Sequence, residues 1–400
     1  MSDHVTQGLV SILNAEPGTA GDVGLRAGWI HLLPARLVCD SSLWCAADTF
    51  IRCWTSSASR GEEAVDHITS ADIRSYNRAI RSLRETLQDK QQAHSTETLA
   101  AVALIYLCED EMGFSRGLPG NCHMSGLRAL LETRGLPKAQ DELEVRLGFE
   151  MLSNLFAYLI DLDGILFFDQ PGWLECLQEA LGPESTIDEQ SRPSYQLCIY
   201  LAHWIRLATL TRALFNEPSV AAAEALAVDA EAVSHSLDAF ESNNEHLFHS
   251  RMCEKPQDTE HNIPGCGAYE FDTWLNCEVL CLHAAATLAV TQIWCSALRV
   301  AGAATESLPR GKLSTMSKRV WMAMPYALQQ PPLRRLVAAT ALILSMEQAE
   351  RSNQLKLATT VKDLLGRRWP PALSLDGQVV AAVLVTCLRL TGRSSFESAP

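Results

Sequence analysis

Two apolar segments of the sequence carry aromatic and ionisable side chains that could line a binding pocket. A buried polar group on such a helix either has a hydrogen-bond partner or borders a cavity that a small apolar molecule can fill. A histidine and a carboxylate in one cavity could also move protons in an isomerisation or a cyclisation. The competing interpretation is a set of core residues with satisfied hydrogen bonds. The candidate pocket residues are His203, Trp204, Trp274, Glu278 and His283.

One local group of candidate metal ligands occurs in the sequence: Cys277, Cys281 and His283. The two cysteines are one helical turn apart and share a helix face, whereas the histidine, two residues further on, points elsewhere. A zinc site would therefore need ligands from distant segments, such as Cys266 or His261. No two of the 13 cysteines have the two-residue separation of zinc ribbons and zinc binuclear clusters. We therefore expect no resident metal and no other cofactor, and interpret the cysteines as small buried hydrophobic residues.

Acidic clusters raise the alternative of a terpene-synthase-like enzyme, which holds magnesium and diphosphate with aspartates on one helix face. Neither cluster in this sequence has a matching Asn, Ser or Glu partner on a later helix, so solvated helix ends explain both. The sequence also lacks a Gly-x-Ser-x-Gly elbow and a glycine-rich phosphate loop. We therefore expect no catalytic and no cofactor-binding residues. The two clusters are Glu109, Asp110 and Glu111, and Asp161, Asp163 and Asp169.

The elements that position these side chains are predicted to be helices, and the stretch 76–135 predicts three of them in succession. The middle one, 99–108, is apolar nearly all round, so neighbouring helices must cover it; Ser95 is its expected N-cap. The third begins near Asn121 and ends at Gly135. The first is predicted to bury a face spaced by three and four residues, formed by Ile73, Tyr76, Ile80, Leu83 and Leu87.

The rest of the chain also predicts helices, and no segment alternates at period two over more than a few residues. We therefore predict an all-α fold, a compact irregular multi-helix bundle. Residues 1–40 form a partly irregular N-terminal segment, and residues 41–400 form the helical domain, with a candidate subdomain boundary at the polar stretch 182–194. The further helices are predicted at 142–160, 195–214, 221–248, 269–300, 316–329, 333–349, 353–365 and 376–390.

Composition limits the partners that this chain can have. Its 400 residues, 47% of them hydrophobic, suffice for a large core. A net charge of −14 repels phosphate backbones, so we expect no direct binding of nucleic acid. The N-terminal sequence lacks the basic start of a signal peptide, and the longest apolar runs are about half as long as a membrane-spanning helix. We expect an intracellular protein of the nucleus or cytoplasm that does not bind membranes.

Three segments of the sequence resemble the regulatory domain of fungal-specific transcription factors, which usually also carry a zinc binuclear cluster. They are YNRAIRSLRETL, LAAVALIYLCEDEM and HMSGLRALLETRG; a fourth, VWMAMPYALQ at 320–329, looks like a piece from near the end of that domain. The resemblance is best over 42–173 and concerns packing, so it implies a fold before an activity. Its His-x-x-Gly-x-x-x-Leu-x-x-x-Arg-Gly pattern falls on His123, Gly126, Leu130, Arg134 and Gly135.

The resemblance implies a transcription-regulator-like protein that lacks its own DNA-binding module. Such a protein would regulate a fungal secondary-metabolite gene cluster through partners of the transcription machinery, a DNA-binding regulator or a small apolar ligand. The alternative is a metal-independent enzyme of secondary metabolism, a cyclase or isomerase, that uses a pocket in the helical scaffold. The resemblance favours the regulator, and the enzyme stays as the alternative because a fold does not fix a function.

Overall fold

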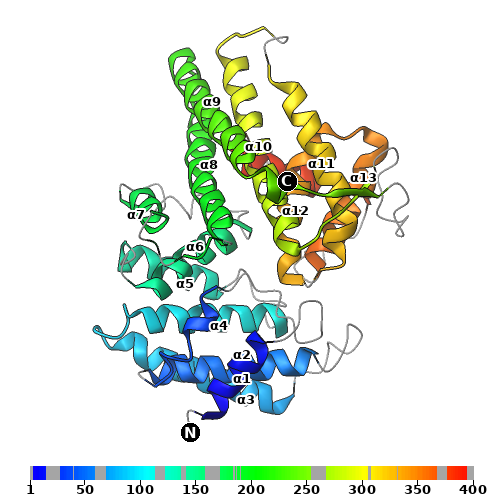
Figure 1. Ribbon diagram of the computed structural model, residues 1–400. Coiled ribbons are helices and arrows are strands. Elements are labelled where there is room, and N and C mark those ends of the chain that lie inside the picture. The colour runs from blue at the N-terminus through cyan, green and yellow to red at the C-terminus, as the bar shows by residue number, and fades with distance from the viewer. Residues whose placement is uncertain are drawn as a thin grey trace. The chain divides into compact units, whose positions relative to one another are not determined.

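A computed structural model gives the arrangement of the chain (Figure 1). The residues that it describes are 3–14, 28–38, 40–58, 69–112, 122–136, 141–157, 172–182, 185, 187–189, 191–253, 267–304, 308–330, 332–366 and 376–393.

The fold is all-α, as the sequence predicts, and the chain divides into two compact units. The first unit is Met1–Met151 and the second is Leu152–Pro400. The polar stretch 182–194, the boundary suggested by the sequence, lies inside the second unit. The elements of the first unit are α1 (Asp3–Leu13), the 3-10 helix η1 (Ile30–Leu32), α2 (Ser41–Ala58), α3 (Ser70–Gln88), α4 (Thr96–Met112), α5 (Cys122–Arg134) and the first part of α6 (Glu142–Ala157).

The core of the first unit forms around α4, as its composition predicts. Every residue from Leu99 to Cys108 is buried, and α2, α3 and α5 pack against this helix. Its first turn is capped by Ser95, whose Oγ accepts a hydrogen bond of 3.0 Å from the backbone N–H of Thr98. A helix that is apolar all round can be stable in water only when neighbours cover it in this way.

The buried face of α3 is not the one that the sequence pattern predicts. Of the predicted stripe, Leu83 is buried and Tyr76 and Ile80 are half-buried, but Ile73 and Leu87 are each 42% exposed. The other buried residues of the helix are small or polar. A polar contact explains the rotation: the Ser75 hydroxyl donates to Asp48 on α2 and lies 3.0 Å from the Thr49 hydroxyl. The buried residues of α3 are Asp72, Ser75, Ala79, Leu83 and Thr86.

The second unit contains the longer helices and the strands that the structure describes. Two of its helices, α8 and α9, form an antiparallel pair visible in green in Figure 1. Its elements are α7 (Trp173–Ala180), α8 (Arg192–Asn216), α9 (Val220–Asn243), η5 (Glu245–Phe248), β1 (Arg251–Cys253), β2 (Ala268–Glu270), α10 (Trp274–Val300), α11 (Arg310–Leu328), α12 (Pro332–Ser345), η7 (Met346–Gln348), α13 (Arg351–Leu365) and α14 (Asp376–Leu390).

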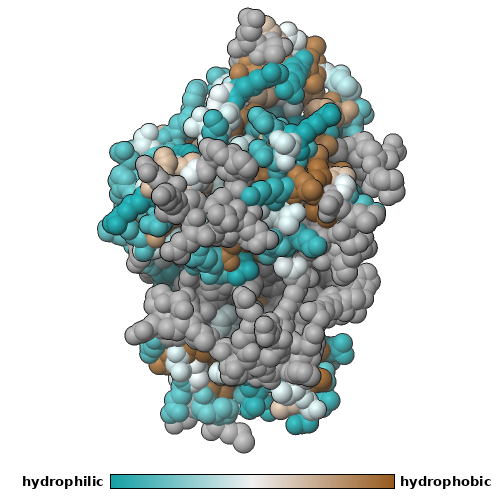
Figure 2. Space-filling view, turned by 90° about the vertical axis from the view of Figure 1, so that its right-hand side faces the viewer, coloured by the Kyte–Doolittle hydropathy of each residue, from teal (hydrophilic) through white to brown (hydrophobic). Residues whose placement is uncertain are grey.

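The core of the second unit forms around α10, which packs against α8, α9, α11 and α12. Among the described helices, α10 is long and apolar enough to cross a membrane, but almost all of its apolar stretch is buried inside the unit. The same length and composition suit the central helix of a folded core. On the face drawn in Figure 2, hydrophilic residues cover most of the described surface and hydrophobic ones lie in small groups.

A short antiparallel ribbon is the feature of the second unit that the sequence pattern missed. Strand β1 pairs with β2 in the register Arg251↔Glu270, Met252↔Tyr269 and Cys253↔Ala268. Strands of three residues are too short to show an alternation of apolar and polar side chains. The ribbon is held by β2, which packs on α11, and by the Phe271 ring, 5.1 Å from that of Tyr326.

Candidate functional site

The predicted pocket residues lie on two helices of the second unit. His203 and Trp204 are on α8, and Trp274, Glu278 and His283 are on α10. Of the five, His283 is the one for which the structure shows a group of polar and aromatic side chains around the ring.

Trp204 joins two helices of the core. Its side chain is fully buried, and its indole N–H donates a 2.8 Å hydrogen bond to the carbonyl of Leu390 at the end of α14. The chain passes very close to α8 just beyond that point, because a Cβ added to Gly392, at φ +69°, would lie 1.9 Å from the Ala208 carbonyl oxygen. Trp204 therefore positions α14 against α8, a structural role that does not leave the indole N–H for a ligand.

His203 is adjacent in sequence but points away from this contact, since consecutive residues of a helix lie on different faces. It is half-buried and makes no hydrogen bond or ion pair among the described residues. Burial, followed by the positive charge of Arg206, lowers the pKa of His203 below its usual value. Its ring is therefore neutral near pH 7.

His283 is enclosed by α9, α10 and η5. Its Nε2 lies 3.0 Å from the carbonyl oxygen of Leu237, so the proton of the neutral ring belongs on Nε2, and Nδ1 lies 4.0 Å from a carboxylate oxygen of Glu241. The ring stacks on Phe240 with centroids 6.1 Å apart and meets the edge of Phe248 at 5.1 Å. Aromatic faces and a backbone carbonyl thus fix both the position and the tautomer of this histidine.

Charged residues of α9 and α11 surround the enclosed ring. Glu241 forms an ion pair with Arg319, whose guanidinium lies 5.4 Å from the centre of the Phe248 ring. Two turns before Arg319 on α11, Lys312 contacts Asp238 at 2.5 Å and the Ser234 hydroxyl at 2.8 Å, both on α9. These pairs link α9 to α11 close enough to His283 for both cations to act on its charge.

The surroundings lower the pKa of His283 to about 4. Burial is the main cause, because it disfavours the imidazolium ion. The carboxylate of Glu241 and the Leu237 carbonyl oppose this change, and the positive charges of Arg319 and Lys312 add to it. The ring is therefore neutral at physiological pH, with an unprotonated Nδ1 facing the carboxylate.

Two threonines extend the polar face of α10 beyond His283. Thr287 and Thr291 follow at intervals of one helical turn, so all three side chains lie on adjoining parts of one face. Both hydroxyls are buried, and neither they nor Nδ1 of His283 has a hydrogen-bond partner in the part of the chain that the structure describes. Such groups are costly to bury without a hydrogen-bond partner.

Glu278 and Trp274 do not complete this site. The two residues are one turn apart on α10, and the five-residue step from Glu278 to His283 places the carboxylate on a different helix face.

Both cysteines of the predicted metal group, Cys277 and Cys281, are buried. Burial, followed by the contact with Cys281, raises the pKa of Cys277 well above its usual value. Among the described residues, no group of three or more His, Cys, Asp and Glu side chains could hold a metal ion.

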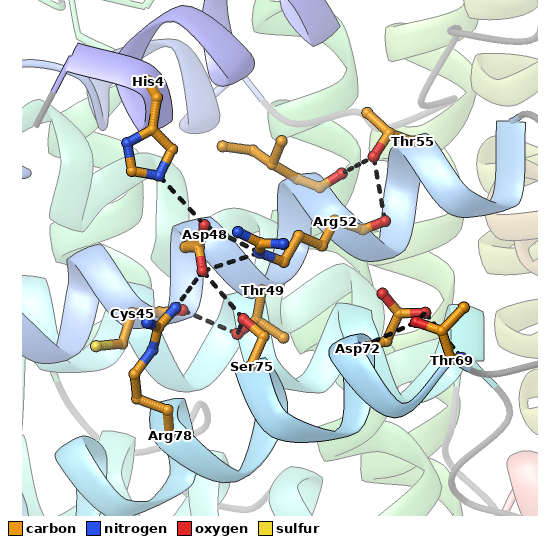
Figure 3. A network of polar contacts seen from close by, with 11 residues as sticks. His4, Cys45, Asp48, Thr49, Arg52, Thr55, Thr69, Asp72, Ser75 and Arg78 are labelled. Atoms are coloured by element: carbon orange, nitrogen blue, oxygen red, sulfur yellow. Dashed lines mark hydrogen bonds and ion pairs between the residues drawn. The ribbon is translucent and has the colours of Figure 1, made fainter. Parts of the chain in front are cut away.

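A second polar group, in the first unit, was missed by the sequence analysis (Figure 3). The buried carboxylate of Asp48 accepts hydrogen bonds from Arg52, at 3.1 Å, and from Arg78 and Ser75. His4 of α1 lies 3.5 Å from the same carboxylate. The only signal in the sequence is the four-residue spacing of Asp48 and Arg52, which is too common on helix surfaces to identify a site.

A third polar group joins α4, α5 and α6 and includes a residue of the transcription-factor-like pattern. Arg134 pairs with Glu144 at 2.8 Å, with side chains only 6% and 5% exposed. The Thr96 hydroxyl donates to Glu144 at 3.0 Å. Gly135 follows with φ +78° and no atom within 4 Å of an added Cβ, so glycine is needed there for the backbone conformation that ends α5.

The acidic clusters of the terpene-synthase alternative are only partly described. Glu109 accepts a hydrogen bond from the Tyr76 hydroxyl, which ties α3 to α4. The side chains of Asp110 and Glu111, and the whole of the cluster at Asp161, Asp163 and Asp169, lie outside the described residues.

No family model, curated protein or solved structure matches this chain. The resemblance to fungal transcription-factor regulatory domains therefore stays a prediction.

Proposed function

We propose that this chain is a transcription-regulator-like protein without a DNA-binding module of its own. It acts in the nucleus or cytoplasm on the expression of a fungal secondary-metabolite gene cluster, through protein partners or a small ligand. The observation that carries the proposal is the use made of the pattern residues: Tyr76 and Arg134 join helices around α4 through Glu109 and Glu144. Tyr76 and Arg134 thus stabilise the packing of helices, a role that fits a regulatory scaffold and does not form a reaction centre.

The candidate pocket supports the same proposal. A general acid or base must reach its substrate and must have a pKa near the working pH. His283 is enclosed, hydrogen-bonded to a backbone carbonyl and has a pKa lowered to about 4, while Trp204 is hydrogen-bonded to Leu390. His283 and Trp204 therefore stabilise the second unit, and their hydrogen-bonding groups are not placed to act as a general acid or base.

Deletion of the gene in its source organism tests the proposal. The strain is complemented with the wild type, with His283→Gln or with Glu278→Gln, and transcripts and metabolites are measured together. Both substitutions keep the size and hydrogen-bonding capacity of the side chain but remove proton transfer. We expect deletion to change the transcripts of one gene cluster and both variants to restore them. Loss of a metabolite with those transcripts unchanged would contradict the regulator.

A metal-independent cyclase or isomerase is the second candidate function. The observation that favours it is the group of buried polar atoms on α10, Nδ1 of His283 and the hydroxyls of Thr287 and Thr291, which have no hydrogen-bond partner among the described residues. An enzyme of this kind would lose activity in His283→Gln, and the same complemented strains report that loss as a missing product.

A further inference from the structure

The outward face of α3 combines apolar and basic residues in a regular pattern. Ile73, Ile80 and Leu87 recur every seventh residue and so form one column along the helix. The two end residues are each 42% exposed and Ile80 is half-buried. We call this column, with the exposed arginines beside it at positions 74, 81 and 84, the α3 seam.

The arginines of the seam have no acidic partner among the described residues. Arg74, Arg81 and Arg84 are exposed and make no ion pair or hydrogen bond there, although the chain has 47 acidic residues against 33 basic ones. By contrast, Arg78 of the same helix is paired with Asp48 and lies 5.5 Å over the ring of Trp44. Within the described part of the first unit, these three cations therefore have no acidic side chain that neutralises them.

The buried contacts of α3 explain why these residues face outward. The polar contact of Ser75 with Asp48 and the burial of Ala79, Leu83 and Thr86 fix the helix rotation. That rotation leaves two large apolar side chains, Ile73 and Leu87, partly in water. Rotating α3 to bury them would break the network of Figure 3.

We propose that the α3 seam binds an acidic amphipathic helix of a partner protein. A helix lying along α3 would cover the column with its own apolar residues at heptad positions and would place its carboxylates opposite the arginines. The apolar column distinguishes this partner from nucleic acid, which offers phosphates but no apolar surface of this kind, and the net charge of −14 opposes nucleic acid further. The inference rests on the proposed function, because it names the surface through which such a regulator contacts a partner.

The test measures fluorescence anisotropy of labelled helical peptides titrated with the full chain. The probe has leucine at the a and d positions and glutamate at e and g, over about 28 residues so that it can form a helix. A matched peptide carries lysine in place of glutamate. We expect the acidic peptide to bind, with an affinity that falls as salt rises, and the basic peptide not to bind.

Two variants of the seam separate its charge from its apolar column. Arg81→Glu/Arg84→Glu replaces attraction by repulsion and is expected to weaken binding roughly tenfold. Ile73→Ser/Leu87→Ser removes apolar contact and is expected to weaken binding by about the same factor. The matched control is Arg351→Glu/Leu355→Ser on α13, a pair with the same chemistry, exposed in the second unit, which is expected to leave the affinity unchanged. Circular dichroism checks that all variants are folded.

Four outcomes would overturn the inference. They are no binding of the acidic peptide by the wild type, equal binding of both peptides, wild-type affinity in the two seam variants, and tighter binding of a labelled DNA duplex than of the acidic peptide. This assay does not depend on transcripts. If the peptide assay fails but the complemented strains restore transcripts, the binding role of the α3 seam is contradicted and the regulatory function is not. If the acidic peptide binds but deletion of the gene has no effect on transcripts, the regulatory function is contradicted and the binding role of the seam is not.

Discussion

His283 illustrates how a residue can be held by several contacts and still have a ring nitrogen without a hydrogen-bond partner among the described residues. Its Nε2–H is held by the Leu237 carbonyl, and its Nδ1 faces Glu241 at 4.0 Å. Because its pKa is lowered to about 4, protonation of the ring is linked to unfolding.

The linkage gives a pH-dependent prediction. Between the unfolded pKa near 6.5 and the folded pKa of about 4, the unfolded chain binds the proton and the folded chain does not, so stability falls as pH falls through this window. We expect the wild type to lose about 2 kcal/mol more than His283→Gln between pH 7 and pH 5. Urea unfolding at both pH values measures the difference, since other titrating groups cancel. An equal loss in both proteins would show that His283 takes up its proton without unfolding.

Arg134 gives a second prediction at the scale of the residue. Removing the guanidinium leaves the Glu144 carboxylate, in a side chain only 5% exposed, without its cation. We expect Arg134→Met to destabilise the first unit by about 3 kcal/mol, and Arg134→Met/Glu144→Leu to recover most of that loss. Denaturant unfolding of the two variants and the wild type measures both effects. A double variant as unstable as the single one would mean that the pair is not the cause.

At the scale of the element, α4 and α10 are the two helices whose sequence is apolar on most sides, and each lies at the centre of its unit. Burial of such a helix removes a large apolar area from water, the dominant favourable term in folding. In an amphipathic helix such as α3, the choice of buried face depends on the neighbours.

The central position of α4 predicts the effect of a charge within it. Leu104 is fully buried, so Leu104→Asp would place a carboxylate in an apolar core. We expect a loss of more than about 3 kcal/mol, beyond the usual range for point substitutions. The matched control is Leu87→Asp on α3, where the side chain is 42% exposed and the loss should be far smaller. Thermal unfolding followed by circular dichroism measures both; an unchanged melting temperature for Leu104→Asp would contradict the role of α4.

At the scale of the whole molecule, charge sets the partners that the chain can attract. A net charge of −14 produces a negative potential that repels nucleic acid and attracts basic surfaces over distances of about 10 Å. The exposed arginines of the α3 seam form a small basic area on this acidic chain, of a size that one partner helix could cover.

The net charge predicts that the purified chain does not bind DNA by itself. Fluorescence anisotropy with labelled duplexes at physiological salt should show no binding above the level of a neutral control protein. Tight binding that weakens steeply as salt rises would contradict this prediction, because such a slope counts phosphates neutralised by the protein.

The sequence by itself determined the local structure of this protein. Helix periodicity and composition predicted the all-α class, the three helices of the stretch 76–135, the cap at Ser95 and the burial of Leu104, since these depend on residues within one or two turns. The helix predicted at 269–300 was right from Trp274 onward, whereas its first two residues belong to strand β2. The segment of His283 was identifiable because a histidine in an apolar helix must find a partner or a cavity.

Only the tertiary structure decided which side chains meet. The partner of His283 is a carbonyl 46 residues away, and Asp48 meets Ser75 over 27 residues, separations that no local pattern encodes. The tertiary contacts also reversed a local preference, because the polar contact of Ser75 turned α3 so that Ile73 and Leu87 face outward. A helix with apolar residues on one side and small polar ones on another can bury either, and the neighbouring helices select the face that satisfies their own buried polar groups.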